Sequence, residues 1–527
     1  MRSSRLPGVR NRLRLRDIEL NQVDVLVLGA GPAGCAAAIL LARRSHRVML
    51  VSPETPISGS LPVSIPPSAR RVLEELGALD SVDAAGLYPN LGNSVIWADD
   101  PPRSEMFSND SKGYHTDLAT LEQILLEVAA QAGVIVHYGH SARSAEQTRT
   151  GWSVRCDGAE GSRVIESSWV IDASGRHGVI ARGEGRQVDR STTTLAIIQR
   201  WKREGGWPEA DRHFTYIESY DTGWAWSVPL GDDLRCYTVM IDQRETELAG
   251  CDLSDILDRE LQRTVHLGRS REGAQPVDQA WACPASLYKA TRYARPGLIL
   301  AGDAGSFIDP LSSFGVKKAL SSGWLAGIVA NTALIDPDMT EASVNFFDSR
   351  EKLVYSRYRE SSAPFFQSAA QSHGTSYWIE RAQAAKKAAV VASDSGLPQA
   401  DIRNQLDLLE SNLPEADVRA AFDEICAQDR LGAVRGKTLR IFEGPGVAGH
   451  RIVMEQRLGS ALWPSGMRYV RGVDLLQLIE AAMSHDQVPE GWAAYNASGA
   501  AVTLPDYLTA LSTAFAAGFL EHGIKVS

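Results

Sequence analysis

The segment 23-VDVLVLGAGPAGCAAAILLARRSHRVMLV-51 decides the fold. Its first six residues are a short, valine-rich apolar run, which is typical of a buried parallel strand. A glycine-rich turn follows, then an alanine-rich helix that we expect to end near Ser45, and RVMLV predicts a second strand. Strand, helix and strand within about 30 residues form one βαβ unit, so the sequence predicts an α/β fold.

The turn of this unit has the pattern G-x-G-x-x-G. Gly29 permits the tight turn, Gly31 lets a pyrophosphate approach the backbone, and Gly34 lets the helix pack closely on the sheet. Pro32 and Ala33 open the helix, whose free N–H groups and positive dipole end favour phosphate. Because the pattern lies between a strand and a helix, it predicts a dinucleotide site, with a glycine turn of another α/β protein as the minor alternative.

The end of the second strand lacks the acidic residue that usually holds the adenosine ribose. Ser52 stands at that place, and Glu54 follows two residues later. We expect Ser52 and Glu54 to form this end of the site, with Glu54 reaching the ribose through a shifted loop. The sequence thus predicts an ordinary phosphate site and an unusual adenosine site.

A second motif, 172-DASGR-176, follows another predicted strand. It resembles the D-A-T-G-R signature of flavoprotein monooxygenases. The resemblance implies that Asp172, Gly175 and Arg176 belong to the cofactor site.

A third motif, 301-AGDAG-305, resembles the G-D-A segment whose aspartate binds the ribityl chain of FAD. It makes Gly302 and Asp303 predicted cofactor residues, because an aspartate at a strand end can accept hydrogen bonds from ribityl hydroxyls. The segment that follows leads into a helix expected over 315–333, whose N-terminal N–H groups can stabilise a reduced flavin. The residues predicted to approach the flavin there are Pro310, Gly315 and Val316. Together the three motifs predict a glutathione-reductase-type FAD-binding fold.

The stretch 224-WAWSVP-229 resembles the W-x-W-x-I-P motif of flavin-dependent halogenases, with valine in place of isoleucine. In that family the motif is thought to help block ordinary monooxygenation near the flavin. The other interpretation is a strand whose alternate residues Trp224 and Trp226 face one side and pack the core. Both interpretations stay open, and both tryptophans are candidate catalytic residues.

Residues 23 to 375 therefore resemble the halogenase-like branch of the flavin-dependent monooxygenases. The catalytic lysine of tryptophan halogenases is absent, because Asn93 stands at its place and the first lysine in the chain is Lys112. Ser312 stands where that family has a second catalytic acid. These differences disfavour a tryptophan halogenase.

Three stretches resemble the flavoproteins that mature tryptophylquinone cofactors in amine dehydrogenases and amino-acid oxidases. They are 60-SLPVSIPPSARRVLEELG-77, 92-GNSVIW-97 and 113-GYHTD-117. The sequence departs from that family at Leu118, where an arginine is expected, and lacks the glutamate of G-E-S.

The resemblance implies an FAD-dependent monooxygenase that hydroxylates an aromatic ring through a flavin hydroperoxide, on a protein-bound tryptophan during quinone cofactor biogenesis. Two alternatives stay open. One is a halogenase or hydroxylase of a small or carrier-bound aromatic, and the other is a non-catalytic FAD-containing maturation factor.

The implied chemistry needs molecular oxygen and an external reductant, either NAD(P)H or a partner flavin reductase, since no second nucleotide fold is found. It requires no strong base, so few acid–base residues are expected. His115, in a segment where a helix is predicted over 115–133, and Lys317 are the candidates. No metal site is expected, because the six cysteines form no C-x-x-C pair or zinc spacing.

Changes in pattern predict the domain boundaries. The expected divisions are a disordered basic tail over 1–22, the first part of the FAD-binding domain over 23–184, an antiparallel-sheet substrate domain over 185–290, the return of the FAD-binding domain over 291–340, a helical region over 341–432 and a small α+β or winged-helix-like unit over 433–527. The last unit is expected either to recognise a peptide partner or to be a helical lid.

Composition excludes some functions. The net charge of −10 over 527 residues argues against nucleic-acid binding, which needs a basic surface. No run reaches the roughly 18 apolar residues of a membrane span. The first 16 residues hold six arginines, which predicts a mobile basic tail, with a transit peptide as the alternative. Sparse cysteines fit a reducing cytoplasm, where we expect the protein.

Overall fold

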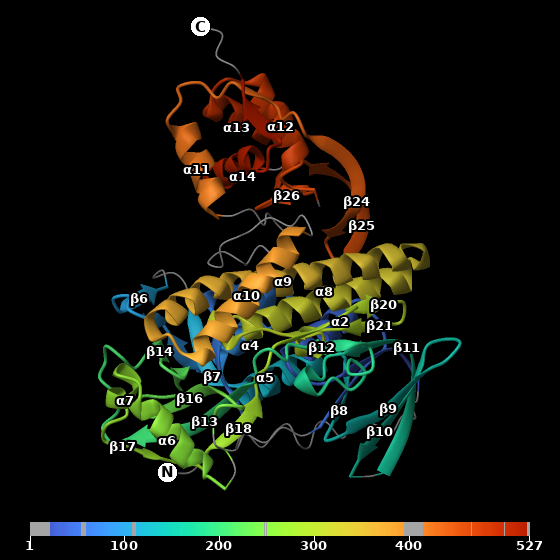
Figure 1. Ribbon diagram of the computed structural model, residues 1–527. Coiled ribbons are helices and arrows are strands. Elements are labelled where there is room, and N and C mark those ends of the chain that lie inside the picture. Colours follow the sequence, from blue (N-terminus) through green and yellow to red (C-terminus); the bar gives the residue numbers. More distant parts are fainter. Residues whose placement is uncertain are drawn as a thin grey trace. The chain divides into compact units, whose positions relative to one another are not determined.

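The chain forms two compact units in the computed structural model (Figure 1). The first runs to Tyr355 and includes Ser362–Ala385, and the second comprises Ser356–Ser361 and the chain from Lys386 onward. The structure describes residues 22–53, 60–107, 112–159, 161–246, 248, 250–394, 415–464, 466–499 and 501–523.

The first unit is built on an eight-stranded sheet whose central strands are parallel. Its main strand order is β20-β21-β11-β1-β2-β8, so β1 of the predicted βαβ unit lies between β11 and β2. The antiparallel strands β9 and β10 extend β11 at one end. The bounds are β1 Gln22–Leu28, β2 Val48–Ser52, β8 Ile135–Tyr138, β9 Ser141–Gln147, β10 Trp152–Gly158, β11 Gly161–Asp172, β20 Ala294–Arg295 and β21 Leu298–Leu300.

Helices α2 (Pro32–Arg43) and α8 (Gly315–Ile335) pack directly on each other against this sheet (Figure 1). Small residues make this approach possible. A Cβ on Gly323 of α8 would collide with the backbone carbonyl of Ala33 in α2, and a Cβ on Gly34 would collide with the carbonyl of Gly29. The backbone of α8 therefore rests on the first turn of α2 with no side chain between them.

A second eight-stranded sheet is mostly antiparallel and has the order β17-β13-β16-β15-β14-β5-β6, with β18 paired to β13. The bounds are β5 Gly92–Ile96, β6 Arg103–Met106, β13 Thr194–Arg203, β14 Phe214–Tyr220, β15 Gly223–Pro229, β16 Leu234–Asp242, β17 Ala274–Pro276 and β18 Trp281–Pro284. Strands β5 and β6 lie in the segment that the sequence assigned to the FAD-binding domain. They join this sheet through a parallel pairing of β5 with β14, a non-local contact that local periodicity does not reveal.

The helix predicted over 115–133 starts later. Residues Gly113–Asp117 form β7, which pairs with β3 (Pro62–Ile65) and β4 (Tyr88–Asn90), and helix α5 spans Leu118–Gln131. The side chain of Asp117 caps α5 by accepting a hydrogen bond from the Thr120 amide at 3.1 Å. The prediction that His115 lies in a helix was wrong, because an N-cap two residues later sets the helix start.

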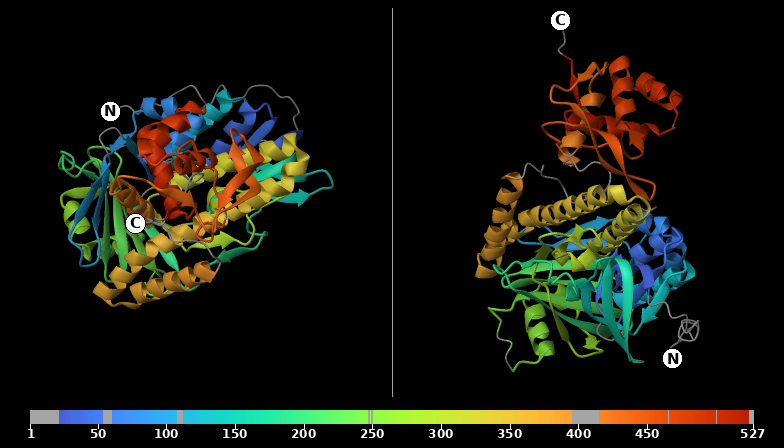
Figure 2. Two further views of the ribbon diagram at one scale, coloured as in Figure 1. Left: turned by 90° about the horizontal axis from the view of Figure 1, so that it is seen from above. Right: turned by 90° about the vertical axis from the view of Figure 1, so that its right-hand side faces the viewer.

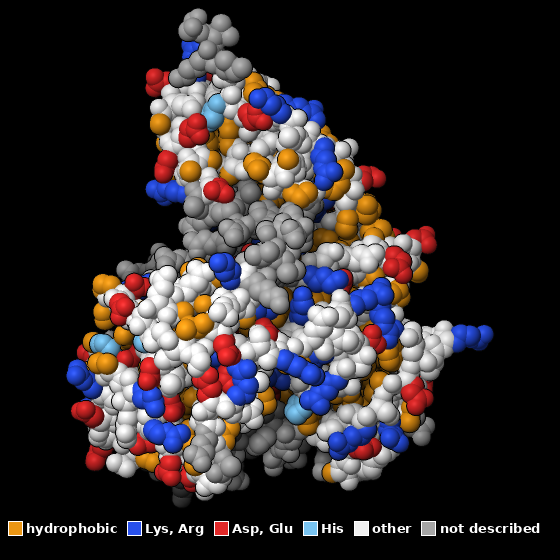
Figure 3. Space-filling model, viewed as in Figure 1, with side chains coloured by type: hydrophobic (Ala, Val, Ile, Leu, Met, Phe, Trp, Pro, Cys, Tyr) orange, Lys and Arg blue, Asp and Glu red, His pale blue; other side chains and the backbone are white. Residues whose placement is uncertain are grey.

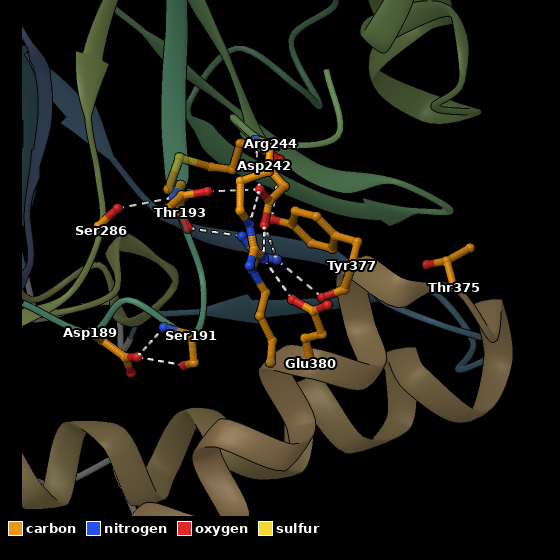
Figure 4. Close-up of polar contacts among 12 residues, drawn as sticks. Asp189, Ser191, Thr193, Asp242, Arg244, Ser286, Thr375, Tyr377 and Glu380 are labelled. Carbon is orange, nitrogen blue, oxygen red and sulfur yellow. Dashed lines mark hydrogen bonds and ion pairs between the residues drawn. The ribbon is translucent and has the colours of Figure 1, made fainter. Parts of the chain in front are cut away.

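Two long helices, α9 (Thr340–His373) and α10 (Ser376–Asp394), follow α8. Within the first unit, an ion cluster around the buried Asp242 ties α10 to the end of β16 (Figure 4). Arg381 of α10 lies 3.5 Å from the carboxylate of Asp242, and Arg244 bridges Asp242 and Glu380. Burial opposes the charge of Asp242, but hydrogen bonds from Arg244 lower its pKa to about 2.

The second unit has its own core around helices α11, α12, α13 and α14. Figure 2 shows the hairpin β24–β25 projecting as a ribbon from these helices. The bounds are α11 Glu415–Cys426, β23 Ala433–Arg435, β24 Arg440–Ala448, β25 Arg451–Gly459, β26 Tyr469–Val470, β27 Val473–Asp474, α12 Leu475–Ser484, α13 Val488–Ala497, α14 Leu504–Ala516 and β28 Leu520–His522. Its buried centre includes Leu475, Leu478, Tyr507, Leu511 and Phe519.

The surface of the first unit carries both signs of charge. On the face shown in Figure 3, its Lys and Arg side chains lie among Asp and Glu side chains. Among the residues with described positions, no helix is long and apolar enough to cross a bilayer.

The contact of α2 with α8 can be tested by Gly323→Ala. Alanine favours a helix over glycine, yet its Cβ would meet the Ala33 carbonyl, so we expect a net loss of about 1–3 kcal/mol. The measurement is urea unfolding. Gly231→Ala is the control, because its Cβ would meet, among the described atoms, only Leu234 Cβ at 3.8 Å. A Gly323→Ala protein as stable as the control would contradict the prediction.

Candidate FAD and substrate site

The glycine turn forms a backbone cradle at the carboxyl end of β1. Gly29 has φ +105°, and a Cβ there would collide with the carbonyl of Ala173. Gly31 is different, because a Cβ there would meet, among the described atoms, only Glu122 Oε1 at 3.6 Å. Gly31 is also the N-cap of α2, and no side chain caps its free N–H groups. The open face of Gly31 and these amides fit a pyrophosphate.

Pro32, Ala33 and Gly34 form the first turn of α2 and are buried. Pro32 stands at the start of the helix, where its missing N–H costs nothing. Glu122, on the buried face of α5, is a residue that sequence reasoning missed. Its signal was an acidic residue among the apolar positions of that helix.

The adenosine end of the predicted site is only partly described. Ser52 ends β2 and is buried, and its carbonyl accepts hydrogen bonds from the amides of Gly139 and His140 at 2.8 and 3.0 Å. Glu54 lies outside the described residues. The contacts predicted for Ser52 and Glu54 with the ribose therefore stay predictions.

Asp172 organises the loop of the second motif rather than facing a ligand. It is fully buried at the end of β11, and its carboxylate accepts hydrogen bonds from the amides of Ile180 and Ala181 at 2.8 and 2.9 Å. The amide and hydroxyl of Ser174 also donate to it. These bonds hold the turn that contains Gly175, and this ordered turn is what presents the next residue, Arg176.

Arg176 links the loop to the second sheet. Its guanidinium donates to the carbonyl of Pro284 at 2.6 Å and lies 5.0 Å from the centre of the Phe307 ring. Burial opposes its charge, but Cys283 and Asp303 raise the pKa of Arg176, so it remains cationic.

Lys318 holds the loop of the third motif from behind. It is buried on α8, and its ammonium donates to the carbonyls of Gly302 and Ser306 and lies 3.5 Å from Asp303 Oδ1. The amide of Gly302 in turn donates to Ser322 Oγ at 2.9 Å. Sequence reasoning missed Lys318, although a lysine in an otherwise apolar buried helix was a usable signal.

The predicted catalytic residue Lys317 does not reach the cavity described below. Its side chain is fully buried, and its ammonium lies 5.3 Å from the centre of the Phe314 ring. Lys317 belongs to the packing at the start of α8.

A cavity of about 230 Å³ in the first unit lies between the segments of the three FAD motifs and the second sheet. Predicted cofactor residues line one side of it: Pro32, Arg176, Asp303, Pro310, Gly315 and Val316. Apolar residues of the second sheet and nearby segments line the other: Leu61, Val63, Ala196, Ile198, Ile217, Val228 and Phe307. The N-terminus of α8, whose N-cap Phe314 makes no side-chain capping hydrogen bond, opens at the cavity. Its amides can therefore stabilise negative charge there.

Trp224 and Trp226 also line this cavity. They lie on β15 with their rings stacked, 4.9 Å between centres and 29° between planes. Trp224 is buried and packs edge-on against Trp97 at 6.2 Å. The two interpretations of this motif are therefore compatible, since Trp224 serves the core and the cavity wall at once.

Asp309 is a further polar residue of the wall. Its carboxylate caps the short helix η4 (Pro310–Ser312) by accepting a hydrogen bond from the Leu311 amide at 3.0 Å. Burial raises the pKa of Asp309.

His115 does not line the cavity but contacts a residue that does. It is buried on β7, and its Nε2 lies 2.9 Å from Oγ1 of Thr215, which lines the cavity. Burial and the nearby Arg235 lower the pKa of His115 to about 3. Its imidazole is therefore neutral near pH 7, and it reaches the cavity only through Thr215.

Residues 22–323 match the family described as the FAD binding domain. The match covers more than half of the 527 residues, so the chain belongs to this family and binds FAD.

Its curated relatives include flavin-dependent halogenases. It is 27% identical over 368 residues to the flavin-dependent halogenase armH3 of Armillaria mellea, covering 64% of this chain and 72% of that protein. It is 29% identical to the tryptophan 2-halogenase of Chondromyces crocatus, covering 61% of this chain and 64% of the relative. The predicted membership among halogenase-like flavin-dependent monooxygenases is confirmed, and the chain is an FAD-dependent oxidoreductase.

Solved structures agree with the fold. The flavin-dependent halogenase CmlS has a TM-score of 0.74 at 19% identity, covering 95% of this chain and 96% of the other. The peptidyl tryptophan dihydroxylase QhpG, essential for tryptophylquinone cofactor biogenesis, has a TM-score of 0.62 at 19% identity, covering 90% and 95%. The predicted α/β FAD-binding fold with an antiparallel sheet and a helical C-terminal region is confirmed.

The cradle can be tested by Gly31→Ala. The new Cβ has room in the protein but would occupy the approach of a pyrophosphate. We expect unfolding stability within about 1 kcal/mol of the original and FAD affinity lower by about 10-fold or more. Flavin absorbance retained on gel filtration measures this. Gly183→Ala is the control, because Gly183 is exposed. Unchanged FAD affinity in Gly31→Ala would refute the assignment of the Gly31 turn as the pyrophosphate site.

The neutral state of His115 predicts a pH dependence of stability. Its pKa is about 3 in the folded protein, against the ordinary histidine value of 6.5 in an unfolded chain, so the unfolded chain binds more protons between these values. The contribution of the neutral His115 to the free energy of unfolding is fully present above pH 6.5. It is lost as the pH falls, at about 1.4 kcal/mol per pH unit. The stability advantage of the original protein over His115→Gln should therefore shrink between about pH 7 and pH 4 in urea unfolding. The exposed His266→Gln is the control, and parallel curves for the original and His115→Gln would contradict this account.

Proposed function

We propose that this protein is an FAD-dependent monooxygenase that hydroxylates an aromatic ring held in the cavity. One observation carries the proposal: a single cavity is lined both by the segments of the three FAD motifs and by the stacked Trp224 and Trp226. Its remaining wall is largely apolar, which suits an aromatic ring and excludes water from the reacting centre.

We assign a different part of FAD to each of several residues of the chain. Bound FAD, reduced by an external reductant, supplies the activation of molecular oxygen. The Gly31 turn would hold the pyrophosphate, and Asp303, positioned by Lys318, would accept hydrogen bonds from ribityl hydroxyls. Gly315 and Val316 line the cavity at the start of α8, and the amides there would favour a reduced, anionic flavin.

Hydroxylation is favoured over halogenation by the missing lysine. Asn93 on β5 stands at the place of the halogenase lysine, and none of the described residues that line the cavity is a lysine. The curated relatives favour halogenation, and halogenation of a small or carrier-bound aromatic is therefore the second candidate. One such relative is the 1H-pyrrole-2-carbonyl-[peptidyl-carrier protein] chlorinase of Pseudomonas fluorescens, at 22% identity.

The proposed substrate is a tryptophan within a protein or peptide. The resemblance of 60–77, 92–97 and 113–117 to tryptophylquinone-maturing flavoproteins supports it, and the structural neighbour QhpG is a peptidyl tryptophan dihydroxylase. A flavin reductase or NAD(P)H is the proposed electron source, and the cytoplasm the proposed location.

The test supplies the FAD-loaded protein with reductant, a flavin reductase, isotopically heavy oxygen gas and a tryptophan-containing peptide, with and without bromide. We expect heavy oxygen in the peptide by mass spectrometry, independent of bromide, and none with protein stripped of FAD. A bromine isotope pattern in place of the oxygen label would establish the halogenase instead. A bound flavin that reductant cannot bleach would identify a non-catalytic maturation factor.

A further inference from the structure

The substrate side of the cavity carries very few hydroxyl groups. Among the described lining residues, Ser64 on β3 and Thr215 on β14 carry a hydroxyl on that side. The hydroxyl of Ser313 belongs to the opposite side, in the segment that follows the third motif. Around Thr215 the wall of the second sheet is apolar, including Ile217 two residues along the same strand. A hydroxyl on such a wall has a strong influence on how a ligand is oriented.

Three strands bring a short hydrogen-bonded chain to this point. Ser64 lies opposite His115 in the β3–β7 pairing, and Thr215 comes from β14. Thr215 Oγ1 lies 2.9 Å from His115 Nε2 and 3.2 Å from Ser64 Oγ. The hydroxyl of Thr215 is therefore held between a buried imidazole and a second hydroxyl at the cavity wall.

Either tautomer of the imidazole leaves Thr215 able to accept a further hydrogen bond. A neutral histidine has one nitrogen that donates and one that accepts. Nε2 lies against Thr215 Oγ1, so it either accepts the hydroxyl proton of Thr215 or donates its own proton to the Thr215 oxygen.

The oxygen of Thr215 has two lone pairs. If Thr215 donates to His115, Ser64 can donate to one lone pair, and if His115 donates to one, Thr215 can donate to Ser64, so in both arrangements a lone pair remains for a ligand in the cavity that Thr215 lines. We propose that Thr215 anchors the aromatic substrate by accepting a hydrogen bond from a ring N–H or ring hydroxyl, and that His115 is a positioning residue for Thr215. The proposal rests on the proposed function for the nature of the ligand, and it narrows the substrate to aromatics with such a donor.

The anchor is tested by binding without turnover. The FAD-loaded, oxidised protein is titrated with indole and with indene, which has the same ring frame with a CH₂ in place of the N–H, and flavin absorbance reports both dissociation constants. We expect indole to bind about 3- to 10-fold more tightly than indene, as one neutral hydrogen bond allows. Thr215→Val should reduce this ratio to about 1, and Thr215→Ser should keep it. An unchanged ratio in Thr215→Val overturns the proposal.

The positioning role of His115 is tested in the same assay. His115→Gln places an amide near the position of Nε2 and should keep the ratio within about 2-fold, while His115→Leu should lower it as Thr215→Val does. Thr238→Val is the matched control, because Thr238 is a buried threonine of β16 outside the described cavity lining and should leave the ratio unchanged. FAD content is measured for each variant to confirm the folded state. The role of His115 is overturned if His115→Leu keeps the full preference for indole over indene. It is also overturned if His115→Gln loses this preference while FAD stays bound.

The binding experiment tests the Thr215 anchor, and the oxygen-labelling experiment tests the monooxygenase. Each can give a negative result without the other. If Thr215→Val loses the ratio but no oxygen enters a substrate, the anchor stands and the monooxygenase does not. If oxygen is incorporated but the ratio survives in Thr215→Val, the monooxygenase stands and the anchor does not.

Discussion

The site depends on backbone-to-backbone contact at the glycine turn. Gly29 meets the carbonyl of Ala173, and Gly323 of α8 meets the carbonyl of Ala33, each at a distance that leaves no room for a Cβ. Since no flexible side chain separates these segments, the first turn of α2, the end of β11 and helix α8 hold one fixed geometry. That geometry brings the uncapped N-termini of both helices to the cavity, where a dinucleotide's phosphates and flavin can both meet positive dipole ends.

Buried polar groups complete this arrangement from behind the cavity. Asp172 is enclosed by four donors from its own loop, and Lys318 donates to the carbonyls of the Asp303 loop. A third group, Asp242 with Arg381, ties α10 to the second sheet. Burying such groups is costly unless their hydrogen bonds are made, so each set favours a single loop conformation. The polar chemistry of the protein thus serves mainly to position segments, while the substrate wall stays largely apolar.

The sequence could predict those parts of the fold and site that are encoded by adjacent residues. The glycine turn, the G-D-A loop and the tryptophan strand are each recognisable within about ten residues, because turn geometry and strand alternation are local properties. The prediction failed where an outcome depended on a distant partner. Strands β5 and β6 lie within the predicted FAD-binding segment but pair with the second sheet. His115 lies in a strand because it pairs with β3 and β4.

By itself, the sequence determined that this chain binds FAD in a βαβ-based fold and belongs with the halogenase-like flavoproteins, because each motif shapes its own backbone. Only the tertiary structure decided which side chains line or support the cavity. It placed Lys318 rather than Lys317 behind Asp303, and Thr215 rather than His115 at the cavity wall. Neighbouring residues on a helix point in different directions, and strands far apart in sequence converge only when the two sheets pack, so no local pattern contains that choice.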